Sequence, residues 1–206
     1  MNFPFLISDI IERIVPGGIF LFVAVFLLGF ERIGLLADKE LLGALAFFGF
    51  SYSFGVLFNV CSNKLTFLET RYFIPEPADY GDVLAREFEV RFREKFSTGS
   101  WRFCYGVVQK ESLAVNTALF GGMAVFCRSM AVCCLFIALT VLFAPLGTRV
   151  EFAFGAVYLG SVILFASLLG GFVFTMGART YGKSFALSIY DSFLTYSLLT
   201  PNPRKS

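Results

Sequence analysis

Few residues of this chain have the types and spacing that chemistry requires. Positions 177–184 read Gly-Ala-Arg-Thr-Tyr-Gly-Lys-Ser, which matches the G-x-x-x-x-G-K-S pattern of loops that cradle phosphates. Such a loop follows a buried strand and opens a helix, whereas this stretch follows a long apolar segment and lacks the acidic residue of a partner strand. We interpret it as a turn of small and basic residues beside a membrane, with nucleotide binding as the alternative.

Nucleophilic catalysis has an equally weak basis. The chain has five cysteines and no histidine, so it lacks the commonest general base and the commonest metal ligand. Cys104 has a positive neighbour in Arg102, but no base accompanies it. The cysteines show no C-x-x-C spacing and are interpreted as reduced and structural, with acylation of Cys61 or Cys127 as the alternative. The sequence therefore predicts no enzyme, no bound cofactor and no metal site.

The elements that would position any site are four apolar segments. Residues 17–30, 41–62, 129–148 and 152–177 contain no Asp, Glu, Lys, Arg or His. Only 16% of the chain is charged, against about a quarter in a soluble domain. Because about 20 helical residues cross a bilayer core, we expect an all-α integral membrane protein with four transmembrane helices.

The basic residues outside these segments predict the orientation. Fourteen lie before the first segment, between the second and third, or after the fourth, whereas three lie in the other two connections. Basic residues resist translocation, so both termini are predicted in the cytoplasm and the chain in the inner (plasma) membrane. The expected parts are an interfacial amphipathic helix that bends at Pro16 (1–16), a first transmembrane hairpin (17–62), a cytosolic helical insertion (63–128), a second transmembrane hairpin (129–177) and a cytosolic helix and tail (178–206). The outward connection at 149–151 is expected to be too short to fold.

The insertion is predicted to be a helical cytosolic layer. Leu84, Phe88, Phe92 and Phe96 recur every four residues, which favours a helix ending near Phe96, although strict alternation at 87–93 is also typical of a strand. A second helix is predicted from about residue 100, with its inward side chains at Trp101, Phe103, Cys104, Val107 and Val108. Eight basic and eight acidic residues leave 63–111 neutral, so direct nucleic-acid binding is not expected.

The third apolar stretch, which runs from 113 to 143, exceeds the thickness of a bilayer core. Placing Arg128 among the lipid headgroups resolves the conflict, because residues 112–127 then continue into the cytosol as an apolar helix that needs protein contacts. Arg13 and Arg128 are therefore predicted at the membrane interface, or lining a vestibule.

Small and polar residues inside the segments are the remaining candidates. Gly49/Ser53 and Ser51/Gly55 are each four residues apart, as are Ser167/Gly171, which is the spacing of faces where membrane helices pack closely. We expect helix packing or an oligomer face at Gly49, Ser53, Gly55, Ser167 and Gly171. Tyr52, Asn59 and Tyr158 are expected to make interhelical hydrogen bonds rather than line a permeation path.

The layout resembles a group of small four-span prokaryotic membrane proteins. The resemblance is carried by a first helix ending in Pro16-Gly17, a Tyr-x-x-Gly from Tyr52 to Gly55 and a long helical insertion before the third span. It implies a membrane effector or anchor in a defence (antiviral) or signalling system, and it assigns no functional residue.

The expected function is that of a non-enzymatic homo-oligomer in the lipid bilayer. Its cytosolic layer would dock a protein partner, and its helices would anchor that partner or open a pore. The alternative function is a small ion channel or solute transporter.

Overall fold

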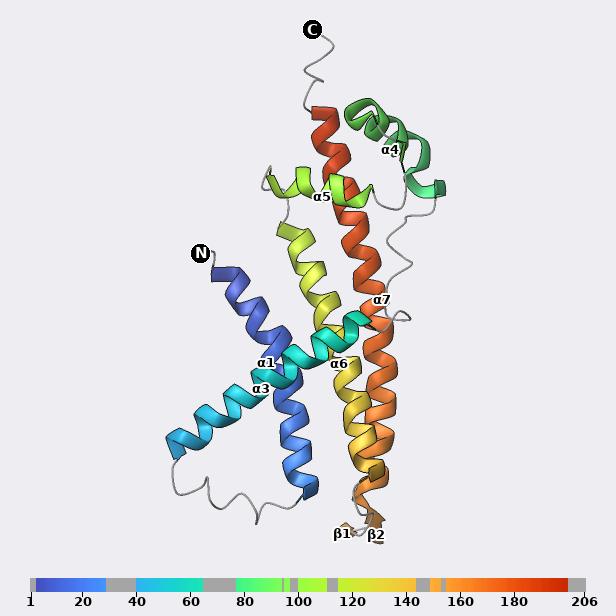
Figure 1. Cartoon of the computed structure of the whole chain (residues 1–206). Coiled ribbons are helices and arrows are strands. Elements are labelled where there is room, and N and C mark those ends of the chain that lie inside the picture. The colour runs from blue at the N-terminus through green and yellow to red at the C-terminus, as the bar shows by residue number, and fades with distance from the viewer. Residues whose placement is uncertain are drawn as a thin grey trace. The chain divides into compact units, whose positions relative to one another are not determined.

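A computed structural model describes residues 3–28, 40–64, 77–93, 95–96, 100–110, 115–143, 149–152 and 155–199 (Figure 1). This part of the chain forms six helices and one pair of strands, in the order α1 (Phe3–Leu28), α3 (Glu40–Lys64), α4 (Pro77–Phe92), α5 (Trp101–Lys110), α6 (Val115–Phe143), β1 (Arg149–Phe152), β2 (Gly155–Tyr158) and α7 (Leu159–Leu199). The chain divides into two compact units. The first unit comprises Met1–Glu69 and Val125–Ala178, and the second comprises Thr70–Ala124 and Arg179–Ser206.

The apolar segments form helices of membrane-spanning length. Within the residues whose side chains are described, three helices are long and apolar enough to cross a bilayer, at Gly43–Lys64, Thr117–Phe143 and Gly160–Leu199. The chain is therefore a predominantly helical membrane protein. The sequence predicts one more span, in α1, and places both termini in the cytoplasm. Both of these stay predictions.

Two of these helices are longer than a bilayer needs. At 1.5 Å per residue, the 29 residues of α6 extend for about 43 Å and the 41 residues of α7 for about 61 Å. A hydrocarbon core is about 30 Å thick, so both helices are longer than the core. The continuation of the third span into the cytosol stays a prediction.

α1 runs through Pro16 as one helix, so residues 3–16 and the start of the first apolar segment belong to a single element, and the interfacial position of 1–16 stays a prediction. A proline removes a single backbone N–H, and neighbouring helices can satisfy the backbone groups that this frees. Pro16 is buried, and its carbonyl oxygen accepts a hydrogen bond from the Cys133 thiol at 3.2 Å. A buried proline with an added partner on a neighbouring helix is thus accommodated inside α1.

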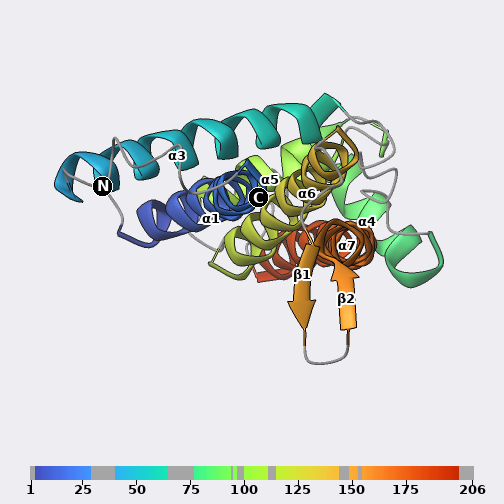
Figure 2. The ribbon, with the colours of Figure 1, turned by 90° about the horizontal axis from the view of Figure 1, so that it is seen from below.

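The fourth apolar segment does not begin as a helix. The strands β1 and β2 pair antiparallel, with Arg149 opposite Tyr158 and Phe152 opposite Gly155 (Figure 2). The expectation that 149–151 would not fold is wrong, and the all-α prediction holds for the described chain except at this pair of strands. The sequence 149–158 is rich in Val, Phe and Tyr and contains one Gly, which are residues that favour short paired strands.

The separate helix predicted at 178–206 and the turn predicted at 177–184 are also wrong. Both ranges begin inside α7, which runs without interruption to Leu199. A single glycine costs a helix only about 1 kcal/mol, and Ala178 and Gly182 are buried against neighbours that offset that cost. Because residues 177–184 are helical, they do not form the phosphate-binding loop that their spacing suggested.

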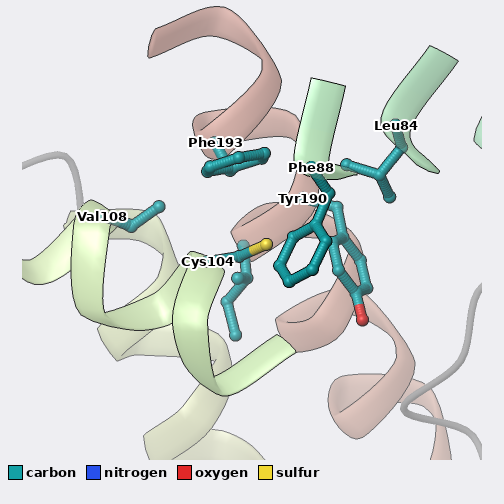
Figure 3. Close-up of a cluster of buried hydrophobic side chains, with 7 residues drawn as sticks. Leu84, Phe88, Cys104, Val108, Tyr190 and Phe193 are labelled. Carbon is teal, nitrogen blue, oxygen red and sulfur yellow. The ribbon is translucent and has the colours of Figure 1, made fainter. Parts of the chain in front are cut away.

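The second unit has its own hydrophobic core. Leu84 and Phe88 of α4 pack against Cys104 and Val108 of α5, as their four-residue spacing predicts, so the helical interpretation of α4 is confirmed. Tyr190 and Phe193 of α7 complete the core, and Figure 3 shows the Cys104 thiol and the Tyr190 ring on either side of Phe88. The helix α4 ends at Phe92 rather than near Phe96, because Arg93 adopts a left-handed backbone conformation with φ of 57°.

Candidate functional site

The closest approach within the first unit is the crossing of α1 and α3 (Figure 1). A Cβ added at Gly17 would overlap the Ser51 carbonyl oxygen, and one added at Gly55 would overlap the Arg13 carbonyl oxygen. Only glycine allows two backbones to come this close, which is the principle of small-residue packing in membranes. The Ser51/Gly55 pair therefore packs α3 on α1, as the sequence predicted for Gly55.

A charged residue borders this crossing. Arg13 of α1 donates a hydrogen bond from Nη1 to the Tyr52 hydroxyl at 2.8 Å, and its guanidinium lies 5.6 Å from the centre of the same ring. The interhelical hydrogen bond expected of Tyr52 is confirmed. The sequence placed Arg13 at the membrane interface without a protein partner, so its pairing with Tyr52 across 39 residues is a finding of the structure.

One buried polar group in the crossing is unsatisfied. The Ser51 side chain is fully buried, and its hydroxyl oxygen makes no hydrogen bond to the residues described; the hydroxyl of Ser129 on α6 is in the same state. A buried hydroxyl without a partner costs roughly 1–3 kcal/mol. The close backbone contact at Gly17 and Gly55 therefore forms in spite of a local polar penalty.

Beside the crossing, aromatic rings fill the core of the first unit. Phe20 of α1 packs against Phe54 and Phe58 of α3, with ring centroids 5.0 and 5.4 Å apart, and Phe136 of α6 closes the group at 5.3 Å from Phe58. Tilted and edge-on rings of this kind stabilise by about 0.5–1.5 kcal/mol per pair beyond their burial. This cluster was not predicted from the sequence. The four-residue spacing of Phe54 and Phe58 was the available signal for it.

The helices α6 and α7 meet through cysteine and glycine within the first unit. A Cβ added at Gly170 would lie 3.3 Å from the Cys134 sulfur, and one at Gly171 would lie 3.5 Å from the Cys134 Cβ. Ser167 is buried and donates to the Ile163 carbonyl oxygen at 2.7 Å. The packing predicted for Ser167 and Gly171 is therefore internal to the chain.

The other predicted site residues are not gathered at one place. Gly49 and Ser53 are exposed, and a Cβ at Gly49 would touch nothing within 4 Å, so no other described part of the chain packs on this pair; an oligomer face there stays a prediction. Arg128 and Asn59 are half-buried. Tyr158 is the last residue of β2 and precedes α7, so it is not inside a spanning helix as predicted, and its side chain lies outside the described residues.

The second unit exposes apolar side chains on four helices. They belong to α4, α5, α6 and the end of α7, and the most exposed are Leu119 at 63%, Leu198 at 70% and Leu199 at 76%. Val83 and Val90 of α4 are each about half exposed and seven residues apart, so they share one face of that helix. The inward position predicted for Phe103 is wrong, because it is 48% exposed, whereas Cys104 and Val108 are buried as predicted.

The chemistry available at these places is limited. All five cysteines are free, and burial raises the pKa of the Cys104 thiol to about 12, so near neutral pH it is a protonated core residue rather than a nucleophile. Within the described residues, no group of three or more His, Cys, Asp or Glu is placed to hold a metal ion. The features that remain are contact surfaces.

Comparison of the chain with protein-family models, curated proteins and solved structures finds no match. The function proposed below is therefore inferred from the described geometry and the sequence.

Proposed function

We propose that the chain is a non-enzymatic, oligomeric membrane component. The first unit is its bilayer anchor, and the second unit lies in the cytoplasm, where it docks a protein partner. The placement in the cytoplasm follows the excess of basic residues on that side. In a defence or signalling system, such a component would hold an effector at the membrane or would itself perturb the bilayer.

The observation that carries the proposal is apolar surface on helix segments that a bilayer cannot cover. Leu198 lies 39 residues beyond Leu159, or about 58 Å along a straight helix, whereas a hydrocarbon core takes up about 30 Å. A core that holds the start of α7 leaves Leu198 and Leu199 outside lipid, although they are at least 70% exposed in the chain. Adjacent exposed leucines that lipid does not cover support a contact with protein when they form part of a contiguous apolar patch.

Leu119 and Met123 support the same conclusion on α6. They lie four residues apart on one helix face, and both are exposed. If Arg128 lies among the lipid headgroups, as the sequence predicts, Leu119 stands nine residues before it on the cytoplasmic side. Their exposure therefore also calls for a protein neighbour.

Oligomerisation is supported by the outward pair on α3. Gly55 is used for packing inside the chain, whereas Gly49 has open space around it and the Ser53 hydroxyl bonds only to the Gly49 carbonyl oxygen, at 2.9 Å. A small-residue face that is left open in one chain is the surface on which a second membrane helix packs closely.

Site-specific photo-crosslinking in the native host tests the docking. A photoreactive residue replaces Val90 or Leu119 in one set of full-length variants and Arg86, an exposed polar position on α4, in the control. We expect one and the same protein adduct from both apolar positions and none from position 86. The absence of adducts at both apolar positions would refute docking, and a monomeric mass for the detergent-extracted chain would refute oligomerisation.

A further inference from the structure

The neutral insertion between the second and third apolar segments is strongly divided in charge. Residues 76–90 contain five acidic residues and one basic residue, a net charge of −4. Residues 91–110 contain five basic residues and one acidic residue, a net charge of +4. The boundary falls at the end of α4, so most of α4 is acidic, and the end of α4 together with α5 is basic.

The outward face of α5 displays this positive charge. Arg102, Gly106 and Lys110 are spaced four residues apart and are all exposed, and the Phe103 ring flanks them. Cys104 and Val108 lie on the opposite side of the helix and are fully buried. A Cβ at Gly106 would meet nothing within 4 Å, so no other described part of the chain covers this face.

The end of α4 adds two more cations next to this face. The Phe92 and Phe103 rings lie 5.6 Å apart, which brings the last residue of α4 beside the start of α5. Arg93 and Lys95 follow directly and are exposed. The left-handed conformation of Arg93, whose N–H bonds to the Glu89 carbonyl oxygen at 2.8 Å, ends the helix at this point. Glu94 and Glu111 lie outside the described residues.

We propose that this surface, the basic α5 face, binds the anionic headgroups of a phospholipid bilayer. It consists of the exposed side chains of Arg93, Lys95, Arg102, Phe103 and Lys110. Cations attract a negatively charged leaflet with about fivefold tighter association for each Lys or Arg near its surface, and an aromatic ring among them enters the headgroup region.

Lipid fits this face better than other anionic ligands do. The described part of the chain has three helices long and apolar enough to cross a bilayer, so phospholipid is an anionic surface that the protein meets in the membrane itself. A dissolved phosphate would gain nothing from the exposed phenyl ring. A nucleic acid, which extends beyond one short helix, would meet the acidic stretch that immediately precedes the face. The binding requires no protein partner and therefore goes beyond the proposed function.

The chain provides its own probe for this contact. Trp101 is its only tryptophan and is the first residue of α5. Full-length protein is reconstituted into lipid nanodiscs that carry a dansyl-labelled headgroup lipid, and Förster transfer from Trp101 to dansyl is measured. One disc preparation contains only zwitterionic phospholipid otherwise, and the other also contains an anionic phospholipid.

We expect higher transfer in the anionic discs, and a loss of that increase at 1 M salt, where the screening length falls to about 3 Å. The variant K95Q/K110Q should lower the ratio of docked to undocked protein by roughly 30-fold, from two cations at about fivefold each. K95R/K110R, which keeps both charges, and R86Q, which removes a charge from the acidic stretch, should behave as the unmodified chain does.

Three results would overturn the proposal. The first is equal transfer in zwitterionic and anionic discs, and the second is transfer that K95Q/K110Q leaves unchanged. The third is a change in the fluorescence of Trp101 when polyglutamate is added to zwitterionic discs, combined with no change in transfer on adding anionic lipid. That result would assign the face to an acidic protein. Since the second unit could bind lipid without docking a partner, failure here leaves the crosslinking result of the proposed function unaffected.

Discussion

Replacing Gly55 by alanine tests the packing of α1 on α3. The added Cβ would lie 2.5 Å from the Arg13 carbonyl carbon and closer still to its oxygen, whereas ordinary contact begins at 3.4 Å. The two helices would have to separate by at least about 0.9 Å, and because the obstacle is backbone, no side chain can turn away to relieve it. Overpacking of this kind costs about 1–3 kcal/mol.

The same substitution at Gly49 provides a matched control. Gly49 lies on the same helix, and an added Cβ there would meet no other described part of the chain, so G49A should leave the packing of α1 on α3 unchanged. The assay is alkylation of Cys133, which is fully buried against Pro16 of α1, as SDS is titrated into the detergent-solubilised protein. We expect Cys133 to become accessible to alkylation at a lower SDS concentration in G55A than in G49A. Identical midpoints for the two variants would show that the helices do not cross at Gly55.

Three further predictions concern the second unit. Replacing Thr117 by valine removes one partner of its 2.9 Å hydrogen bond with the Ser188 hydroxyl and should lower the free energy of unfolding by about 1 kcal/mol. Adding S188A should recover part of this loss. No recovery would mean that the two hydroxyls are not coupled. The pKa of Cys104 rises from 9.0 to about 12 on folding because the thiol is buried, so the stabilisation from its neutral thiol is complete below pH 9 and is lost between pH 9 and 12. Across this range, alkylation of Cys104 should stay slower than alkylation of the half-buried Cys61. Equal rates would contradict the burial of Cys104. Phe88→Ala should cost about 3–5 kcal/mol and shift the emission of Trp101, whereas a change under 1 kcal/mol would contradict the shared core of α4, α5 and α7.

The sequence predicted those elements whose pattern has a single physical cause. Long uncharged runs favour helices, because a helix satisfies its own backbone groups in lipid, so α3, α6 and most of the fourth segment, in α7, were foreseeable. The four-residue spacing of Leu84 and Phe88 predicted both the helix and its buried side. Gly55 lies at a packing contact, as its four-residue spacing from Ser51 suggested, because small side chains allow the backbones of two membrane helices to approach closely.

The errors arose where two local signals compete and tertiary contacts decide between them. Pro16 was expected to end a helix, but the burial of Pro16 and its contact with Cys133 favour continuation. Gly49/Ser53 and Ser51/Gly55 have identical spacing, and nothing in the sequence says which pair faces α1. The pairing of Arg13 with Tyr52 depends on how two helices cross, which composition does not encode.

The different surroundings of Cys133 and Cys134 matter for anyone preparing a thiol-free background for spectroscopic labelling. The Cys133 sulfur is a donor to a carbonyl, so serine preserves that role at position 133. The Cys134 sulfur instead fills the space above Gly170, and its Cβ lies 3.5 Å from a Cβ added at Gly171, so alanine keeps the Cβ contact in the seam between α6 and α7. The two adjacent thiols therefore call for different substitutions.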